Sequence, residues 1–168
     1  RVVATANRLG VDLVALTGDF VDGPVARLAQ HVAPLAELRP AERVFFVLGN
    51  HDVYAGANAW VEHFRSLGLR VLLNEHALLL HAGAPVLVGG VLDPSIQRFD
   101  AALRPRPDLA AGDRSLPALR LLLAHHPGLA PLAAQAGFDL QLSGHTHAGQ
   151  FFPYTLAVRL VHAPHFHG

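Results

Sequence analysis

Short apolar runs alternate with amphipathic segments along most of the chain. Runs such as 12–17 and 43–48 have the length of buried strands, and the stretches between the runs have the period of helices. This alternation is typical of an α/β protein whose sheet is covered on both faces. We expect helices at 1–9, 24–38, 57–67, 98–103 and 128–136, and strands at 12–17, 43–48, 70–73, 77–81, 86–91, 119–124, 138–142 and 158–163.

The segment 70–91 departs from this alternation. Its three predicted strands are separated only by Asn74-Glu75 and Gly83-Ala84, which leaves no room for a helix. Short connections of this kind join antiparallel neighbours. We therefore expect an antiparallel part of the sheet at 70–91, and a surface loop at 104–114, where Pro, Arg and Asp are dense.

Composition limits the class of protein. The 168 residues fit one domain, and 51% of them are hydrophobic, so a substantial core can form. The 13 basic and 13 acidic side chains cancel and are dispersed, so the chain has no evident nucleic-acid-binding patch. Cysteine is absent, so any metal rests on nitrogen and oxygen ligands. No apolar run is long enough to cross a bilayer.

A polar cluster directly follows each of four predicted strands. In α/β sheets, groups at the carboxyl ends of strands converge on one crevice, so we expect the four clusters to form one site. They are Thr17-Gly18-Asp19, Gly49-Asn50-His51-Asp52, His125-His126-Pro127 and Gly144-His145-Thr146-His147.

These clusters carry the donors of a transition-metal site. Asp19 offers a carboxylate that can bridge two cations, and Asn50 offers a neutral carbonyl oxygen. This mixture of donors suits Mn, Fe or Zn better than Ca or Mg, which prefer oxygen alone. Two such ions sharing a hydroxide would provide a nucleophile for phosphate esters, so the clusters predict a phosphoester hydrolase. The imidazoles come from His125, His145 and His147.

His51 is the candidate acid that protonates the departing alkoxide. Asp52 follows it directly, and we expect the Asp52 carboxylate to accept the other ring N–H and to keep the imidazole protonated. Asp22 is assigned to helix capping or to orienting a neighbouring group. Surface positions without a special role are expected for His31, His63, His76 and His81.

Each cluster also has a purely structural interpretation. Taken alone, Gly18-Asp19 is most simply a strand-end turn with a capping carboxylate, and His125 is most simply a partly buried core histidine. Gly144–His147, followed by Ala148-Gly149-Gln150, is rarer and favours a metal by itself. The presence of all four clusters in this order, each at a strand end, favours one metal site.

With these motifs in place, the sequence resembles the calcineurin-like metallophosphoesterase family. The family pattern is Asp-x-His, Gly-Asp-x-x-Asp, Gly-Asn-His-Asp or -Glu, a lone His, and Gly-His-x-His. The last four occur here at 18–22, 49–52, 125 and 144–147. The residues around His125 and those at 143–150 look most like the bacterial YkuE-like subgroup, and the resemblance spans the whole chain.

The resemblance implies a single domain, 1–168, built as a sandwich of mixed sheets flanked by helices and holding two divalent metal ions. No Asp-x-His precedes Asp19, so we expect the first strand and two ligands of one ion to lie upstream of Arg1. His51 would face the phosphate of the substrate, and His126 would only neighbour the site. Asp19 would bridge the ions, His147 would join one of them, and Asn50, His125 and His145 would complete the other.

The resemblance also bears on partners and location. The partner is a phosphoester substrate, and the oligomeric state is left open. Several members of the subgroup carry a membrane anchor or export signal. The full-length bacterial protein is therefore expected at a membrane or exported if such a segment lies upstream, and in the cytoplasm otherwise.

Loops near the clusters are expected to form the walls of the substrate pocket. These walls come from 53–60, the region 93–100 and the loop 148–157. The aromatic side chains there either contact the substrate or pack the loops. They are Tyr54, Trp60, Phe151, Phe152 and Tyr154.

A second hypothesis belongs to a different class of function. The same fold can serve as a metal-binding scaffold that docks a partner protein without turning over a substrate. The presence of His51 beside Asp52 argues against it, because a scaffold needs metal ligands but no acid for a leaving group.

Overall fold

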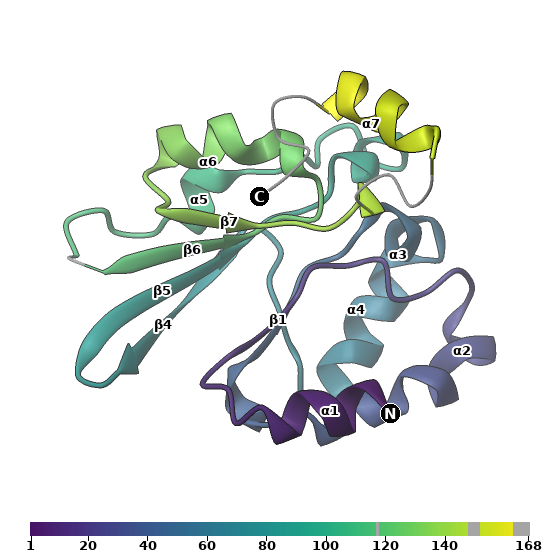
Figure 1. The fold of residues 1–168 in the computed structure, drawn as a ribbon, viewed down its shortest axis with the longest axis horizontal. Coiled ribbons are helices and arrows are strands. Elements are labelled where there is room, and N and C mark those ends of the chain that lie inside the picture. Colours follow the sequence, from purple (N-terminus) through teal and green to yellow (C-terminus); the bar gives the residue numbers. More distant parts are fainter. Residues whose placement is uncertain (117, 148–151, 163–168) are drawn as a thin grey trace.

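The chain folds into two β-sheets that lie against each other, with helices on the outer faces. The structure, a computed structural model, describes residues 1–116, 118–147 and 152–162. One sheet has the strand order β1-β2-β3 and the other the order β4-β5-β6-β7. In Figure 1, α5 and α6 lie along the four-stranded sheet, while α1, α2 and α4 lie beside the three-stranded one. The predicted α/β class, with mixed sheets flanked by helices, is confirmed.

The three-stranded sheet is parallel throughout. Its strands are β1 (Val14–Leu16), β2 (Val44–Phe46) and β3 (Arg70–Val71). The helices in this half are α1 (Val2–Arg8), α2 (Val25–Val32), α3 (Asn50–Tyr54) and α4 (Ala57–Ser66), with 3₁₀ turns η1 (Ala33–Glu37) and η2 (Ala41–Arg43).

The four-stranded sheet is mixed. Strands β4 (Glu75–His81) and β5 (Ala84–Gly90) are antiparallel, whereas β6 (Leu119–Leu123) and β7 (Leu140–Leu142) continue it in parallel. The remaining elements are η3 (Pro94–Arg98), α5 (Pro107–Ala110), η4 (Pro127–Leu129), α6 (Ala130–Ala136) and α7 (Tyr154–His162).

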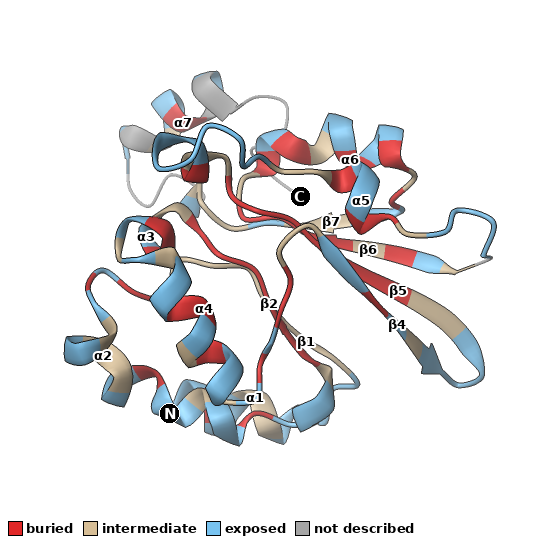
Figure 2. Cartoon of the chain, turned by 180° about the vertical axis from the view of Figure 1, so that it is seen from behind, coloured by how far each residue is buried: buried red, intermediate tan, exposed pale blue. Residues whose placement is uncertain are grey.

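The run 44–48, which contains β2 and the two residues after it, shows why an unbroken apolar run lies at the centre of the molecule. Phe46 and Leu48 pack with the helices on the outer face, and Phe45 and Val47 pack between the sheets against Val88 and Leu123. Side chains alternate between the faces of a strand, so a run buried on both faces is apolar at every position. Figure 2 shows this continuous buried layer through the middle of the molecule.

Two consecutive glycines in β5 allow the layers on either side of it to approach closely. A Cβ at Gly89 would lie 2.7 Å from the Phe138 ring, and one at Gly90 would lie 2.7 Å from Val47. Real side chains do not come so close, so larger residues would push Phe138 or the opposing sheet away.

Several predicted elements differ from the structure. The segment 70–73 does not join the antiparallel meander, because β3 pairs with β2 in the other sheet. The helix at 24–38 divides at Pro34, which has no N–H for an α-helical hydrogen bond, so α2 gives way to η1. The helix expected at 98–103 is the earlier 3₁₀ turn η3, and the loop 104–114 contains α5.

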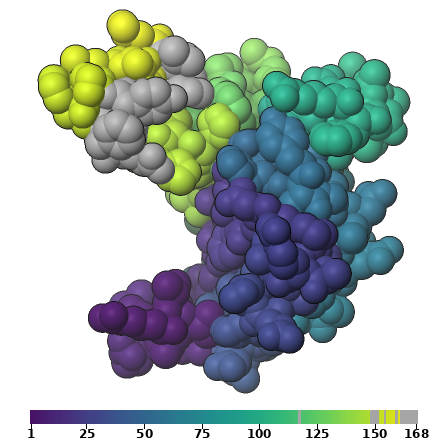
Figure 3. All heavy atoms as spheres, turned by 90° about the vertical axis from the view of Figure 1, so that its right-hand side faces the viewer, coloured from purple at the N-terminus to yellow at the C-terminus, as the bar shows by residue number. Residues whose placement is uncertain are grey.

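The strand predicted at 158–163 is wrong, because residues 154–162 form helix α7. Leu156 and Leu160 are four apart, a spacing that fits a helix, and a short apolar run alone does not separate the two states. Figure 3 shows α1 and α7 projecting from the same side of the molecule, with a broad hollow between them. Within the described ranges, no helix combines the length and apolar character needed to span a bilayer.

Candidate metal centre

The loop after β1 carries Asp19, and a buried carboxylate fixes its shape. Asp52 is fully buried and accepts backbone N–H groups from four residues at 2.8–3.1 Å. Three of these donors belong to the loop after β1 and one to the loop after β2, so Asp52 joins the two loops. The donors are Gly49, Asp19, Phe20 and Val21.

Two glycines let these loops touch. Gly18 has φ +89°, and a Cβ there would lie 2.7 Å from the Cα of Gly49. A Cβ on Gly49 would in turn lie 2.5 Å from the backbone nitrogen of Asp19. With both side chains absent, the His51 N–H donates to Oδ1 of Asp19 at 3.0 Å. The glycines therefore bring the Asp19 carboxylate against the start of α3.

Three side chains from the ends of three strands form a metal-like cluster. Asp19, His125 and His145 each offer one ligand atom, and these atoms all lie within 4.8 Å of one another. Nε2 of His125 is 3.0 Å from Oδ2 of Asp19 and 3.3 Å from Nδ1 of His145. The Asn50 side-chain oxygen is 2.9 Å from the same nitrogen of His145. The structure thus brings all four predicted ligands of one ion together.

The hydrogen bonds around His125 show that a cation suits this cluster. Nδ1 of His125 lies 2.7 Å from the carbonyl oxygen of Thr17, which can only accept, so this nitrogen carries the proton. In the neutral imidazole, Nε2 then presents a lone pair toward the carboxylate oxygen of Asp19. Two acceptors at such a distance need a proton or a metal ion between them. Asp19, Asn50, His125 and His145 therefore fit a divalent cation.

Backbone conformation supports a functional assignment. Asp19, His145 and His147 have φ values of 61°, 68° and 50°, in the left-handed region that costs energy for residues with side chains. Such conformations persist where the surroundings hold them, and they concentrate at ligand sites. Three of the five non-glycine residues with positive φ in the described ranges are predicted metal ligands.

His51 interacts with Asp22, not with Asp52 as we predicted. Nδ1 of His51 forms a short hydrogen bond with Oδ1 of Asp22, and both side chains are at least half exposed. This bond is the main cause of the raised pKa of His51. Burial opposes it, and the negative charges of Asp19, Asp22 and Asp52 add smaller increases. Asp52 is unavailable to the ring because its oxygens bind backbone N–H groups. Of the two roles assigned to Asp22, the structure supports the orientation of a neighbouring group, since the N-cap of α2 is Pro24 with no side-chain cap.

His147 and His126 do not belong to the cluster of three ligand atoms. His147 is exposed and is not among the three residues whose ligand atoms cluster. The His126 ring lies 4.7 Å from the His145 ring, tilted by 34°, and its Nδ1 accepts the N–H of Gly128 at 3.1 Å. His126 thus neighbours a ligand, while the adjacent His125 enters the cluster.

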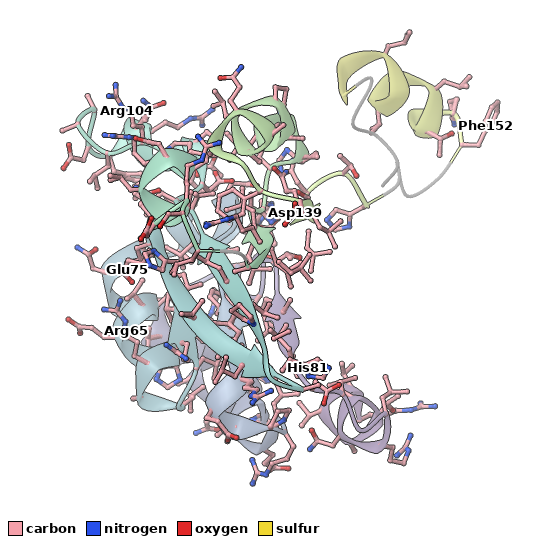
Figure 4. The ribbon with its side chains drawn as sticks, turned by 90° about the vertical axis from the view of Figure 1, so that its left-hand side faces the viewer. Arg65, Glu75, His81, Arg104, Asp139 and Phe152 are labelled. Carbon is pink, nitrogen blue, oxygen red and sulfur yellow. The ribbon has the colours of Figure 1, made fainter. Side chains whose placement is uncertain are left out.

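The predicted pocket walls are partly present. A pocket of about 390 Å³ is lined by residues of 53–59 and 96–103, which overlap the expected segments. Trp60 is not a wall residue, since it is fully buried and its Nε1 donates to the carbonyl oxygen of Gly23 at 2.9 Å. Phe152 is exposed next to α7, away from the sheets (Figure 4). Phe151 and the side chain of Tyr154 lie outside the described parts of the chain.

Comparison with known proteins gives the same class as the geometry. The model of the calcineurin-like phosphoesterase family matches residues 1–149. This chain belongs to that family. Members are hydrolases that act on phosphoester bonds with divalent metal ions.

Relatives of the chain share its full extent but are longer. It is 33% identical to a transmembrane protein with metallophosphoesterase domain from Danio rerio, an alignment covering 100% of this chain and 40% of the relative. It is 34% identical to an uncharacterized metallophosphoesterase of Helicobacter pylori, covering 99% of this chain and 44% of the relative. The chain therefore spans less than half of these proteins. No solved structure gave a significant match.

Proposed function

We propose that the protein hydrolyses phosphate esters at a two-metal centre built around Asp19, His125 and His145. The observation that carries this proposal is the convergence of their ligand atoms within 4.8 Å from three separate strand ends. Family membership supports the reaction class.

The ligands divide between two ions. One ion would be held by Asp19, Asn50, His125 and His145, and a second by Asp19 and His147 with further donors. Mn, Fe or Zn suits this set of imidazoles and oxygens. When bound, the two ions would acidify a water molecule and offset the negative charge that builds on the phosphate.

His51 would act as the acid for the leaving group. Its Nδ1 is bonded to Asp22, so Nε2 is the ring atom available to the substrate. The raised pKa of His51 extends the imidazolium, the form that can donate a proton to a departing alkoxide, to higher pH than in a free histidine. Asp22 would orient the ring, and Asp52 would brace the loops that hold Asp19 and Asn50.

Hydrolysis of a nitrophenyl phosphodiester with Mn²⁺ supplied tests the proposal. The full-length protein should release nitrophenolate, and Asn50→Ala and His145→Ala in that protein should each lower kcat by about a hundredfold or more. His31→Ala is the matched control, because His31 is an exposed histidine on α2. No turnover, or turnover unaffected by the two ligand variants, would refute the proposal. Tight metal binding without turnover would favour the scaffold hypothesis instead.

A further inference from the structure

A second hollow adjoins the one that contains the candidate acid. His51 and Asp22 line a pocket of about 220 Å³, and Tyr54 forms part of its wall. Tyr54 also lines the larger pocket of about 390 Å³, between the 53–59 segment and the 96–103 segment. The two hollows therefore share Tyr54 as a wall residue.

Aromatic rings lie where the two hollows meet at Tyr54. The ring of Tyr54 lies 6.3 Å from the His51 ring and 6.3 Å from the Phe99 ring. Tyr54 is 46% exposed and Phe99 is 65% exposed, which is high for side chains of this size. The Arg98 guanidinium lies 5.7 Å from the Tyr54 ring centre and holds that ring by a cation–π contact. The boundary between the two hollows therefore carries exposed aromatic surface that a ligand can contact.

The lining of the larger pocket is mostly hydrocarbon. Both segments contribute large apolar groups, and the 53–59 segment also contributes small residues that leave room for a ligand. The large groups are Val53, Ile96, Phe99 and Leu103, and the small ones are Gly56, Ala57 and Ala59.

The charged residue that lines this pocket disfavours an anionic ligand inside it, while Arg98 lies over the Tyr54 ring and is not among the described lining residues. Asp100 is the only acidic or basic side chain among the described lining residues, and its Oδ1 already accepts the N–H of Ala102 at 2.9 Å. A carboxylate repels a second phosphate, such as that of a nucleoside diphosphate. The uncharged polar groups among the described lining residues are the Asn58 amide and the Tyr54 hydroxyl. Apolar burial, and not directional hydrogen bonding, is the recognition that this lining offers.

We propose that this pocket binds a hydrocarbon chain on the alcohol released by the enzyme. The inference rests on the proposed function, because His51 would protonate the leaving oxygen and so fixes where the alcohol begins. A chain attached to that oxygen extends past Tyr54 toward Phe99 and Leu103. The substrate class is accordingly a phosphoester of a long-chain alcohol, as found in lipids.

Binding of non-hydrolysable alkylphosphonates tests this without requiring turnover. Methyl-, hexyl- and dodecylphosphonate, each below its micellar concentration, are titrated by calorimetry into the Mn²⁺-loaded protein. Hexylphosphonate should bind at least about tenfold more tightly than methylphosphonate, because each buried methylene adds affinity. Phe99→Ser and Leu103→Ser should each remove most of this dependence on length. Leu80→Ser is the control, since Leu80 is an exposed leucine of β4 outside the pocket, and it should retain the dependence.

The outcomes separate this inference from the proposed function. Equal affinity for the three phosphonates, or a length dependence that survives both pocket variants, would overturn the chain-binding pocket. Tighter binding of adenosine monophosphate than of dodecylphosphonate would overturn it too, and would indicate a nucleotide. Length-dependent binding without phosphodiester hydrolysis would support the pocket while refuting the proposed reaction.

Discussion

At the scale of single residues, two carboxylates near His51 have opposite surroundings. Asp52 is buried and takes its hydrogen bonds from the backbone, whereas Asp22 is exposed and bonds the His51 ring. Burial raises the pKa of Asp52, and the N–H groups of Gly49, Asp19 and Phe20 oppose that rise by binding the charged form. Asp52 therefore holds the loops of the site in place, and Asp22 raises the pKa of His51.

Replacing Asp52 tests its structural task. Asp52→Asn leaves one acceptor oxygen for four N–H groups and adds an amide donor among them, so the free energy of unfolding should fall by roughly 2–4 kcal/mol. Chemical denaturation measures this change. Asp12→Asn, at an exposed aspartate, should change stability by less than about 0.5 kcal/mol. Equal stability of the two variants would contradict the bracing role.

Replacing Asp22 tests its effect on His51. Asp22→Asn removes the main cause of the raised pKa, so the pKa of His51 should fall, as followed by NMR of the ring protons in the metal-free protein. Because the folded-state pKa is raised, the stabilisation that His51 provides is present at pH below the unfolded value and is lost as pH rises through the folded value. In Asp22→Asn this pH dependence should shrink. Asp12→Asn, which lies beside His81, should leave the titration of His51 unchanged.

At the scale of elements, the contact between the loops after β1 and β2 decides the site. These loops approach closely only because Gly18 and Gly49 lack side chains. The parallel pairing of β1 with β2 brings both loops to the same sheet edge. Metal affinity should therefore depend on a glycine that touches no metal.

A methyl group at Gly49 should separate the loops. Gly49→Ala would meet the Asp19 backbone, lowering stability by about 1–3 kcal/mol and Mn²⁺ affinity by about tenfold or more. Gly23→Ala is the control, because its nearest neighbour is the flexible end of Arg27. Calorimetric titration with Mn²⁺ compares the two. An unchanged affinity in Gly49→Ala would show that the loop contact is dispensable.

The sequence placed the polar motifs at strand ends, but it did not predict the partner of His51 or the helix at 154–162. Apolar runs before Asp19, Asn50 and His125 located the crevice, because strand direction alone brings such residues together. The partner of His51 was missed because sequence proximity favoured Asp52, while the backbone folds its carboxylate inward. The state of 154–162 was missed because that short apolar run fits a strand as well as a helix.

At the scale of the whole molecule, the site joins the two sheets. Asp19 and Asn50 follow strands of the three-stranded sheet, and His125 and His145 follow strands of the four-stranded sheet. Their convergence depends on the apolar layer between the sheets, which includes Phe45 and Leu123. The central claim is that these four side chains bind one divalent ion.

Equilibrium binding of Mn²⁺ to the metal-free protein tests this claim most directly. The wild-type protein should bind Mn²⁺, and His145→Ala should bind it at least about tenfold more weakly because one of four ligands is lost. His31→Ala, which removes an exposed histidine outside the cluster, should bind as the wild type does. The same affinity in all three proteins, or no binding to any of them, would contradict the account.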